Sequence, residues 1–551
     1  MNLHTASSFQ YQILRALLLI AVMLLFTACS SDEKSPAADS IGQEASNAEA
    51  ASTGFVPLEV AEAIDRVTSQ PRYEHSSWGF SVRDLSTGEV LLNQSGEKMF
   101  VPGSILKTFS TATVLDSYGP DYRFRTPVYR TNTPNQGVLD GNLVLVASGD
   151  LSLGLREQSD GTMAFNSAPE HDHTYANTGA EVGLVGDPLT GLNGLAQQVR
   201  DAGIQEVQGE VVIDDRLFKP WESPDGLISP ILVNENQIDI TTTPSSPGDA
   251  AEVDWRPRTA AYKVEADVQT VAANEETNLE VDDSEPGIIR ISGQIAAGSE
   301  PAIRVGEVQD PTAFARAAFI EALEKVGVAV SAKATGSNPL QLLPPENFYR
   351  EGDRVAEHVS APLKEFTKVI LKVSHNPGAQ LLTCLVAVKA GSRDCEEGLK
   401  QEFELYTSLG VSPESTIIFD GAGSDERERT TPNAMTKFLR AVDDQSFGEV
   451  FRSSLAVLGV DGDIAQTQKD SPAAGRIQAK TGTRGVPTPT GQGLLTARTL
   501  VGYAKAESGR RLVIAIMVRD VPVSSPQDLL PMVETATADQ GALAAAIQQG
   551  Y

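Results

Sequence analysis

The chain has 551 residues, of which 41% are hydrophobic and 21% charged, and its 73 acidic and 44 basic side chains give a formal net charge of −29. This composition is ordinary for a chain that buries a core, so it excludes general disorder and a polytopic membrane protein, and the length predicts about three domains. The negative charge excludes nucleic-acid binding driven by electrostatics, and three cysteines exclude a disulfide-rich scaffold and a four-cysteine zinc site.

The N-terminus has the pattern of an export signal. Residues 16–26 form an unbroken apolar run, which is too short to span a bilayer but typical of the hydrophobic part of a signal peptide. The run leads into Thr27-Ala28-Cys29, which resembles a bacterial lipobox, although Phe26 stands where leucine is preferred. We predict that residues 1–29 are a lipoprotein-type signal peptide with a membrane-anchoring lipid on Cys29; secretion without a lipid is the alternative. Either route leads to the periplasm or cell envelope.

Residues 30–54 are rich in serine, alanine and acidic residues and have almost no large apolar side chain. Such a segment cannot bury enough surface to fold, so we predict a disordered tether. A flexible coil of this length reaches roughly 25–30 Å on average.

The rest of the chain has the periodicity of folded elements. The first part predicts a helix over 57–69, a hairpin of strands 78–85 and 89–93, and a helix from Ser104 to about Gly119. Residues 123–354 alternate turn signals with short β-like runs, among them 143–147, 207–213 and 288–291. The last part predicts helical segments over 364–389, 396–409 and 432–442, strands over 499–504 and 511–518, and a final helix over 526–548.

Ser104 and Lys107 lie three residues apart at the start of a predicted helix, so they share one face of it. A lysine that burial keeps neutral can take the proton of a neighbouring serine, which makes the serine a nucleophile. A helix-capping serine beside a solvated lysine is the alternative. Two further Ser-x-x-Lys matches, Ser31/Lys34 and Ser95/Lys98, lack the helical context.

Two more short motifs follow later in the chain. Ser374-His375-Asn376 comes after an apolar run and before a predicted helix, where its hydroxyl and amide can point into a cleft or can cap the helix. Lys480-Thr481-Gly482-Thr483 precedes the two predicted strands 499–504 and 511–518. A cation and a hydroxyl at a sheet edge suit an extended peptide that ends in a carboxylate.

These three motifs, in this order, resemble those of the serine penicillin-recognising enzymes. The sequence around the motifs resembles that of the D-alanyl-D-alanine carboxypeptidase/endopeptidases of peptidase family S13, the class C low-molecular-mass penicillin-binding proteins. The stretches that carry the resemblance are 100–104, 141–150, 211–214, 458–462 and 479–483. The long gap between Ser104 and Ser374 supports this branch, because β-lactamases lack room for it and this branch inserts extra domains there.

The resemblance implies an α/β (α+β) fold with a penicillin-binding, β-lactamase-like transpeptidase core. The core comprises residues 55–122 plus 355–551, and a mainly β insertion of two subdomains spans 123–354. Two residues near the motifs differ from the usual sequence of the family. Gly103 stands where alanine is usual, and Ala422, within Asp420-Gly421-Ala422-Gly423, stands where serine is usual.

The resemblance also implies roles for the site residues. Ser104 is the nucleophile, Lys107 its base and Ser374 a proton relay. The substrate-binding group comprises Asn376, Lys480, Thr481, Gly482 and Thr483. No metal or organic cofactor is implied. The partners are peptidoglycan peptides ending in D-Ala-D-Ala and, as inhibitors, β-lactams.

Other residues leave alternatives open. Trp221 and Asp225 lie in the insertion, either in a surface turn or near the substrate, where an anion suits an ammonium group. Cys384 and Cys395 form either a disulfide or a pair of buried thiols. His171 and His173 make a poor metal set and are expected in a polar loop. His375 is assigned no proton-transfer role.

The sequence therefore predicts a serine-type D-Ala-D-Ala carboxypeptidase and/or DD-endopeptidase that works through an acyl-enzyme on Ser104. A β-lactamase and a non-catalytic penicillin-binding envelope protein are the alternatives.

Overall fold

The computed structural model of the protein describes residues 56–168, 170–178 and 180–551. The predicted signal peptide, the lipid attachment at Cys29 and the tether lie outside the described residues. Within the described ranges, none of the helices combines the length and the apolar character that a membrane crossing needs.

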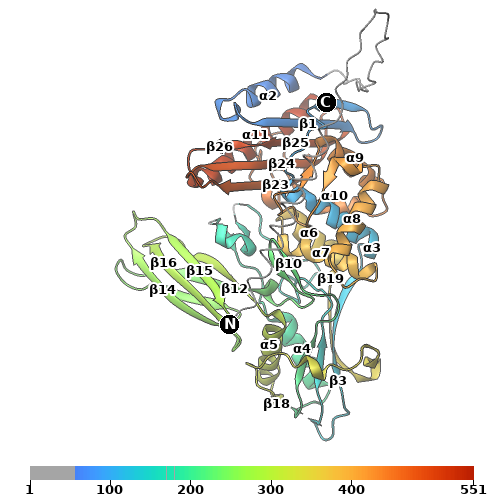
Figure 1. Ribbon diagram of the computed structural model, residues 1–551, viewed down its shortest axis with the longest axis vertical. Helices are drawn as coiled ribbons and strands as arrows, with labels where there is room; N and C mark the ends of the chain where they lie inside the picture. Colours follow the sequence, from blue (N-terminus) through green and yellow to red (C-terminus); the bar gives the residue numbers. More distant parts are fainter. Residues whose placement is uncertain (1–55, 169, 179) are drawn as a thin grey trace, which may run out of the picture. The chain divides into compact units, whose positions relative to one another are not determined.

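A seven-stranded antiparallel sheet brings the two ends of the described chain together (Figure 1). The strand order is β2-β1-β25-β24-β23-β22, and β26 also pairs with β24. The predicted hairpin is confirmed, because β1 and β2 pair, and the predicted C-terminal strands are β24 and β25. The strands are β1 (Ser77–Asp84), β2 (Val90–Gln94), β22 (Ala456–Val457), β23 (Ile477–Pro487), β24 (Gly493–Lys505), β25 (Arg511–Arg519) and β26 (Val521–Val523).

Both faces of this sheet are covered by helices. Along β25, Ile514 and Ile516 join one apolar cluster and Val513 and Met517 join another, because successive side chains of a strand point to opposite faces. One face packs against α2 (Leu58–Thr68) and α11 (Leu529–Gly550), and the other against α9 (Pro432–Asp443). Further helices, α3 (Lys107–Tyr118), α6 (Leu363–Lys372), α7 (Asn376–Lys389), α8 (Glu396–Ser408) and α10 (Gly448–Ser454), complete this part.

The helical pattern over 364–389 is two helices, not one. α6 ends at Lys372 and α7 begins at Asn376, and Ser374 between them has a positive φ of 63°. A left-handed residue cannot continue a right-handed helix, so the chain turns here. His375 caps the new helix, because its Nδ1 accepts a hydrogen bond of 2.9 Å from the N–H of Gly378.

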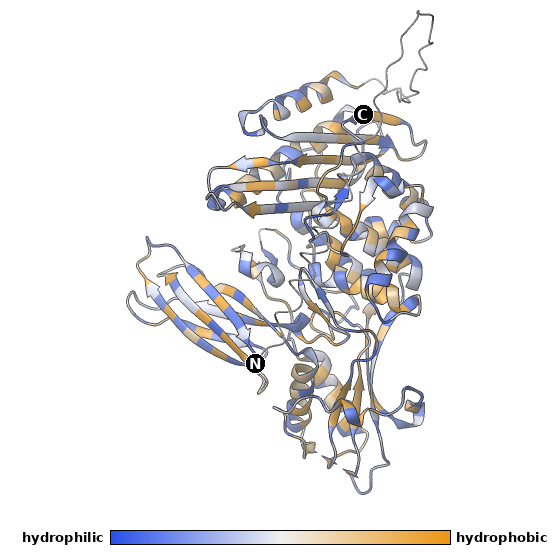
Figure 2. Cartoon of the chain, viewed as in Figure 1, coloured by the Kyte–Doolittle hydropathy of each residue, from blue (hydrophilic) through white to orange (hydrophobic). Residues whose placement is uncertain are grey.

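The region between the first and second motifs is built from small sheets and two helices, α4 (Thr190–Asp201) and α5 (Pro311–Lys325). Figure 2 shows hydrophobic and hydrophilic residues alternating along its strands, as expected where one face of a sheet is exposed. The expected strand over 207–213 is divided into β8 (Glu206–Val207) and β9 (Val211–Asp214). One of its sheets has the order β19-β3-β5-β9, and β19 (Arg354–Pro362) carries this sheet beyond the predicted boundary at 354.

The remaining strands of this region lie in that four-stranded sheet or in smaller sheets of two or three strands. They are β3 (Arg123–Arg130), β4 (Val138–Leu139), β5 (Leu143–Val146), β6 (His171–Asp172), β7 (Val182–Gly183), β10 (Trp221–Ser223), β11 (Gly226–Ile228), β12 (Gln237–Thr243), β13 (Glu252–Arg256), β14 (Lys263–Val271), β15 (Asn278–Glu285), β16 (Ile288–Ala296), β17 (Ala302–Glu307) and β18 (Ala329–Val330).

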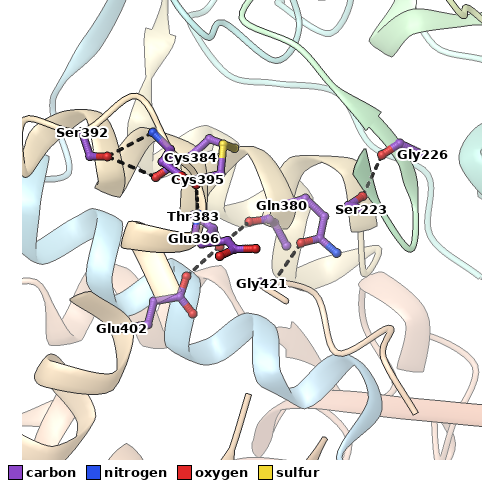
Figure 3. Close-up of a disulfide and its surroundings, with 12 residues drawn as sticks. Ser223, Gly226, Gln380, Thr383, Cys384, Ser392, Cys395, Glu396, Glu402 and Gly421 are labelled. Atoms are coloured by element: carbon purple, nitrogen blue, oxygen red, sulfur yellow. Dashed lines mark hydrogen bonds between the residues drawn. A yellow bond between two sulfur atoms is a disulfide. The ribbon is translucent and has the colours of Figure 1, made fainter. Parts of the chain in front are cut away.

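A disulfide between Cys384 and Cys395 joins α7 to the start of α8 (Figure 3). Of the two alternatives from the sequence, the structure has the bonded pair. Next to it, the Thr383 hydroxyl donates to the buried carboxyl of Glu402 at 2.7 Å, and burial raises the pKa of Glu402 to about 8. A covalent bond therefore joins α7 to the start of α8, and a hydrogen bond joins the two helices farther along α8.

The disulfide predicts a stability difference. Replacing both cysteines, in Cys384→Ala/Cys395→Ala, should lower the free energy of unfolding by about 3 kcal/mol, because the bond closes a loop across 11 residues and so restricts the unfolded chain. Urea unfolding with and without a thiol reductant measures this. The reductant should shift the midpoint of the wild type and leave that of the double variant in place; equal responses would contradict a disulfide in the folded protein.

Candidate active site

The first motif lies where a 3-10 turn, η2 (Gly103–Leu106), runs into α3. Ser104 is half-buried in this turn, and Lys107, the first residue of α3, is fully buried. Lys107 Nζ donates to Ser104 Oγ at 2.7 Å. The alternative of a solvated lysine beside a capping serine is therefore wrong.

The Lys107 amine meets two more acceptors. It donates to Asn376 Oδ1 at 2.6 Å and to the carbonyl oxygen of Ala422 at 3.0 Å. Burial lowers the pKa of Lys107 to about 7, and the positive charge of Lys480 contributes to the shift. A lysine with this pKa is neutral in an appreciable fraction of molecules at neutral pH and can accept the proton of a hydroxyl.

The second motif presents a fixed amide to the first. Asn376 Oδ1 accepts the hydrogen bond from Lys107, and Asn376 Nδ2 donates to Asp225 Oδ1 at 2.7 Å. These two partners determine which end of the amide is oxygen and which is nitrogen. Ser374 is half-buried, and its carbonyl oxygen accepts a hydrogen bond of 2.5 Å from the Tyr175 hydroxyl. The helix-capping alternative applies to His375, the middle residue of the motif, and not to Asn376.

The third motif lies on β23, beside β24 as the sequence predicts. Lys480 is buried, and its Nζ donates to the carbonyl of Thr481 at 2.8 Å and lies 3.5 Å from Asp463 Oδ2. The Thr481 hydroxyl also donates to Asp463. Arg498 on β24 donates to Thr483 Oγ1 at 2.7 Å, which places a second buried cation next to the motif.

The first and third motifs touch through their glycines. A Cβ on Gly482 would lie 2.3 Å from the carbonyl oxygen of Pro102 and 3.0 Å from the Ser104 nitrogen. A Cβ on Gly103, whose φ is +56°, would lie 2.9 Å from the Thr483 nitrogen. The backbone nitrogens of Ser104 and Thr483 therefore lie close together, and glycine at 103 suits both the φ and the close approach.

The loop after β20 (Thr416–Ile417) supports this centre with its backbone. The Asp420 carboxylate accepts from the N–H groups of Ala422 and Gly423, both at 2.7 Å, and so folds the loop around itself. Ala422 contacts Lys107 through its carbonyl oxygen, so the missing serine hydroxyl at this position is not part of that contact.

Asp225 is half-buried at the turn between β10 and β11, which points at the second motif. Besides Asn376, it accepts hydrogen bonds from Gln380 Nε2 at 2.7 Å and from Ser424 Oγ at 2.9 Å. Trp221, on β10, packs against the apolar cluster around α7. Asp225 is therefore an anchor for Asn376, a role that differs from both a surface turn and a free ammonium site.

Several residues of this centre had no signal in the sequence. Tyr175 acts on Ser374 across 199 positions of the chain, and Asp463 reaches Lys480 and Thr481 from a separate 3-10 turn. The carbonyl of Ala422 could not be found from residue type, because every residue has one.

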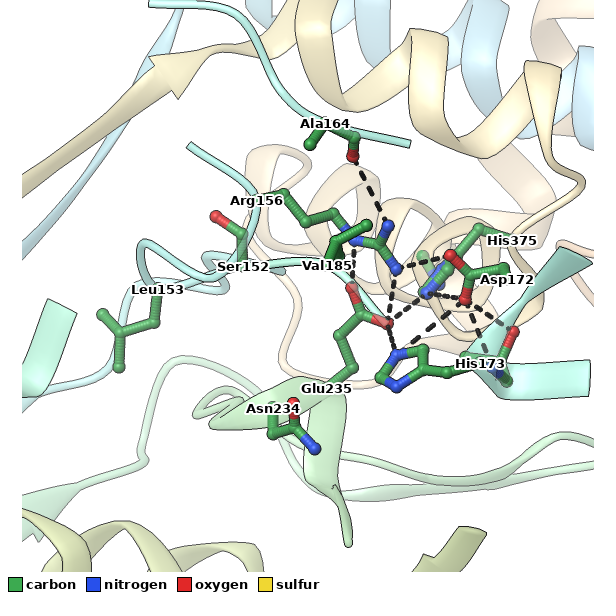
Figure 4. A network of polar contacts seen from close by, with 12 residues as sticks. Ser152, Leu153, Arg156, Ala164, Asp172, His173, Val185, Asn234, Glu235 and His375 are labelled. Carbon is green, nitrogen blue, oxygen red and sulfur yellow. Dashed lines mark hydrogen bonds and ion pairs between the residues drawn. The ribbon is translucent and has the colours of Figure 1, made fainter. Parts of the chain in front are cut away.

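His173 is not in an exposed polar loop. It is 2% exposed and lies in a buried charge network with Asp172, Glu235 and other residues (Figure 4). His171, two residues earlier in the chain, is exposed.

Comparison with known proteins agrees with these observations. The sequence model of the D-Ala-D-Ala carboxypeptidase 3 (S13) family matches residues 60–538. A D-alanyl-D-alanine carboxypeptidase of Actinomadura sp. (strain R39) is 26% identical over 481 residues, 81% of this chain and 82% of the relative. The D-alanyl-D-alanine carboxypeptidase DacB of Haemophilus influenzae is 21% identical over 416 residues, 71% of this chain and 76% of the relative.

The crystal structure of penicillin-binding protein 4 (dacB) from Haemophilus influenzae superposes with a TM-score of 0.64 at 18% identity. The match covers 88% of this chain and 98% of that one. The predicted fold class, a penicillin-binding core of mixed helices and strands, is confirmed. The chain belongs to the D-Ala-D-Ala carboxypeptidase 3 (S13) family and is thus a serine-type D-Ala-D-Ala carboxypeptidase.

Proposed function

We propose that Ser104 is the nucleophile of a D-Ala-D-Ala carboxypeptidase and/or DD-endopeptidase that acts on peptidoglycan stem peptides and cross-links. The observation that carries this proposal is the 2.7 Å contact between Ser104 Oγ and the buried amine of Lys107, whose pKa is about 7. A nucleophile and its base within hydrogen-bonding distance, with the base held by further partners, is the arrangement that covalent catalysis needs.

In the proposed acylation step, neutral Lys107 takes the hydroxyl proton of Ser104, and Ser104 Oγ attacks the carbonyl carbon of the penultimate D-Ala. The N–H groups of Ser104 and Thr483 stabilise the developing oxyanion, a contribution of about 3–4 kcal/mol per donor. As the peptide bond breaks, Ser374 relays this proton from Lys107 to the leaving amine, which returns Lys107 to its neutral form. Water then hydrolyses the ester on Ser104 and restores the free hydroxyl.

The binding groups suit a peptide with a terminal carboxylate. The peptide adds as a strand along β23, where Gly482 lets this strand pass close to Pro102 and Ser104, and Asn376 donates to the substrate backbone. Lys480, Thr481 and Thr483 hold the carboxylate, and Arg498 supports Thr483 through its 2.7 Å hydrogen bond. A β-lactam has the same carboxylate and a reactive amide, so it acylates Ser104 in place of the peptide.

D-Ala release from a model peptide ending in D-Ala-D-Ala tests the proposal. Ser104→Ala should lower the rate by at least about 10³-fold, because the nucleophile is lost. The matched control is Ser95→Ala, the exposed serine of the other Ser-x-x-Lys in the described part of the chain, which should keep the wild-type rate. Cross-linked muropeptides in the same assay measure the endopeptidase activity. Full activity of Ser104→Ala would contradict the proposal, and rapid hydrolysis of a penicillin instead of the peptide would indicate a β-lactamase.

The pKa of Lys107 predicts the pH dependence of acylation. Because the neutral amine is the base, the acylation rate should rise with pH through about 7 and level off above it. A pH series of β-lactam acylation rates between about pH 5.5 and 9 measures this. Lys107→Arg, which stays charged, should remove the rising limb together with most of the activity; a wild-type rate that is flat or falls across neutral pH would contradict Lys107 as the base.

We further propose that the protein works in the cell envelope, tethered by a lipid on Cys29. The motif Thr27-Ala28-Cys29 after a short apolar run supports this. Cys29→Ala should move the protein from the membrane fraction to the soluble fraction of the envelope, as judged by immunoblotting of both fractions. Equal membrane association of the variant and the wild type would contradict the lipid anchor.

A further inference from the structure

A buried charge cluster lies in the inserted region, at the place where this region contacts the second motif (Figure 4). Its charged members all come from the inserted region, and His375 of the second motif contacts them. We call this group the charge cluster; it consists of Arg156, Asp172, His173, Glu235, Asp239 and Arg256. All but Arg256 have side chains that are at most 2% exposed.

Glu235 is the member that reaches the second motif. Its carboxylate accepts from Arg156 Nε at 2.5 Å, from His173 Nε2 at 2.8 Å and from His375 Nε2 at 2.6 Å. The direction of the last bond follows from the other ring nitrogen: His375 Nδ1 accepts from the N–H of Gly378, so the proton is on Nε2. Glu235 therefore holds the ring of His375 from one side while α7 holds it from the other.

The cluster is electrically balanced, which explains how it can be buried. His173 has a carboxylate at each ring nitrogen, Asp239 at 2.7 Å from Nδ1 and Glu235 at 2.8 Å from Nε2, so both nitrogens donate and the ring is an imidazolium. The neighbouring carboxylates raise the pKa of His173 accordingly. Three cations then face three carboxylates, and the guanidinium of Arg156 occupies the space between Asp172 and Glu235.

The backbone is constrained at both ends of the bond from Glu235 to His375. Asn234, Glu235 and Asn236 have φ values of 50°, 54° and 59°, a left-handed run of three non-glycine residues. Ser374 has a φ of 63°. Such conformations persist where the surrounding contacts determine them, and they gather at functional sites. Tyr175, two residues beyond His173, adds a second contact from the same segment through its bond to the Ser374 carbonyl.

We propose that Glu235 is a positioning residue of the acylation reaction: its hydrogen bond to His375 fixes the turn that carries Ser374 and Asn376 beside Ser104 and Lys107. The inference rests on the proposed function, because it concerns the turn that presents the relay hydroxyl and the Asn376 amide. Asn376 lies 2.6 Å from the Lys107 amine, so a shift of the turn changes the surroundings of the base directly. Small displacements of reacting groups lower rates strongly.

Two carboxylate-to-amide variants distinguish a role of Glu235 in positioning the second motif from a general role in stabilising the fold. Glu235→Gln and Asp239→Asn each neutralise a buried carboxylate that contacts His173, but Glu235 contacts His375 and Asp239 has no hydrogen bond to it. The acylation rate constant and the dissociation constant of the initial complex are measured separately with a fluorescent penicillin on the purified full chain, at a temperature where thermal melts show each variant folded.

The proposal predicts that Glu235→Gln lowers the acylation rate constant by about tenfold or more, with the dissociation constant within about twofold of wild type. Asp239→Asn should keep both constants within about twofold. Equal loss in both variants, or an unchanged rate constant in Glu235→Gln, overturns it. A wild type that is not acylated refutes the proposed function instead, which distinguishes the two failures.

His375→Asn provides a second, independent variant in case Glu235→Gln does not fold. An asparagine can still cap α7 at Gly378 but is too short to reach Glu235. Its acylation rate constant should fall as in Glu235→Gln, and where both fold, the double variant should be no slower than the single ones, because the two residues act through one contact. A His375→Asn variant with the wild-type rate constant overturns the proposal.

Discussion

A buried amine needs hydrogen-bond acceptors inside the protein. Lys107 has three, and they come from parts of the chain that are far from one another in sequence. Ser104 lies on the same turn, Asn376 at the start of α7, and the carbonyl of Ala422 in a loop folded around the Asp420 carboxylate. Because each acceptor has to be in place for the amine to be satisfied, the burial of Lys107 ties these segments together. The same burial lowers the pKa of Lys107 to about 7, so one constraint sets both the geometry and the basicity of the site.

The region between the first and second motifs contributes to this site although it contains none of the three motifs. Asp225 orients the amide of Asn376, Tyr175 binds the carbonyl of Ser374, and Glu235 binds His375, so every residue of the second motif is bound from this region. The motif needs this support because Ser374 has a left-handed backbone, which costs roughly 1–3 kcal/mol for a non-glycine residue. This region is thus a structural part of the site.

Short-range patterns in the sequence were sufficient for the elements and the family. The hairpin β1–β2, the helix after Ser104 and the strands around the third motif follow from periodicity and turn residues, and the fold class follows from the three motifs together. The helical pattern over 364–389 did not predict the break between α6 and α7, although Ser374-His375-Asn376 was expected directly before a helix. The partners of the second motif were not predictable either, because Asp225, Tyr175 and Glu235 meet it only through long-range packing. Roles for the motif residues came from resemblance, and the geometry adds the reason that Lys107 can be a base.

The central claim is that Ser104 forms an acyl-enzyme in a site built around the buried amine of Lys107. Intact mass of the purified protein after incubation with benzylpenicillin, beside Ser104→Ala, tests it most directly. The account predicts a stable adduct of one penicillin on the wild type and none on the variant. The absence of an adduct with the penicillin intact, or the same adduct on Ser104→Ala, would contradict it.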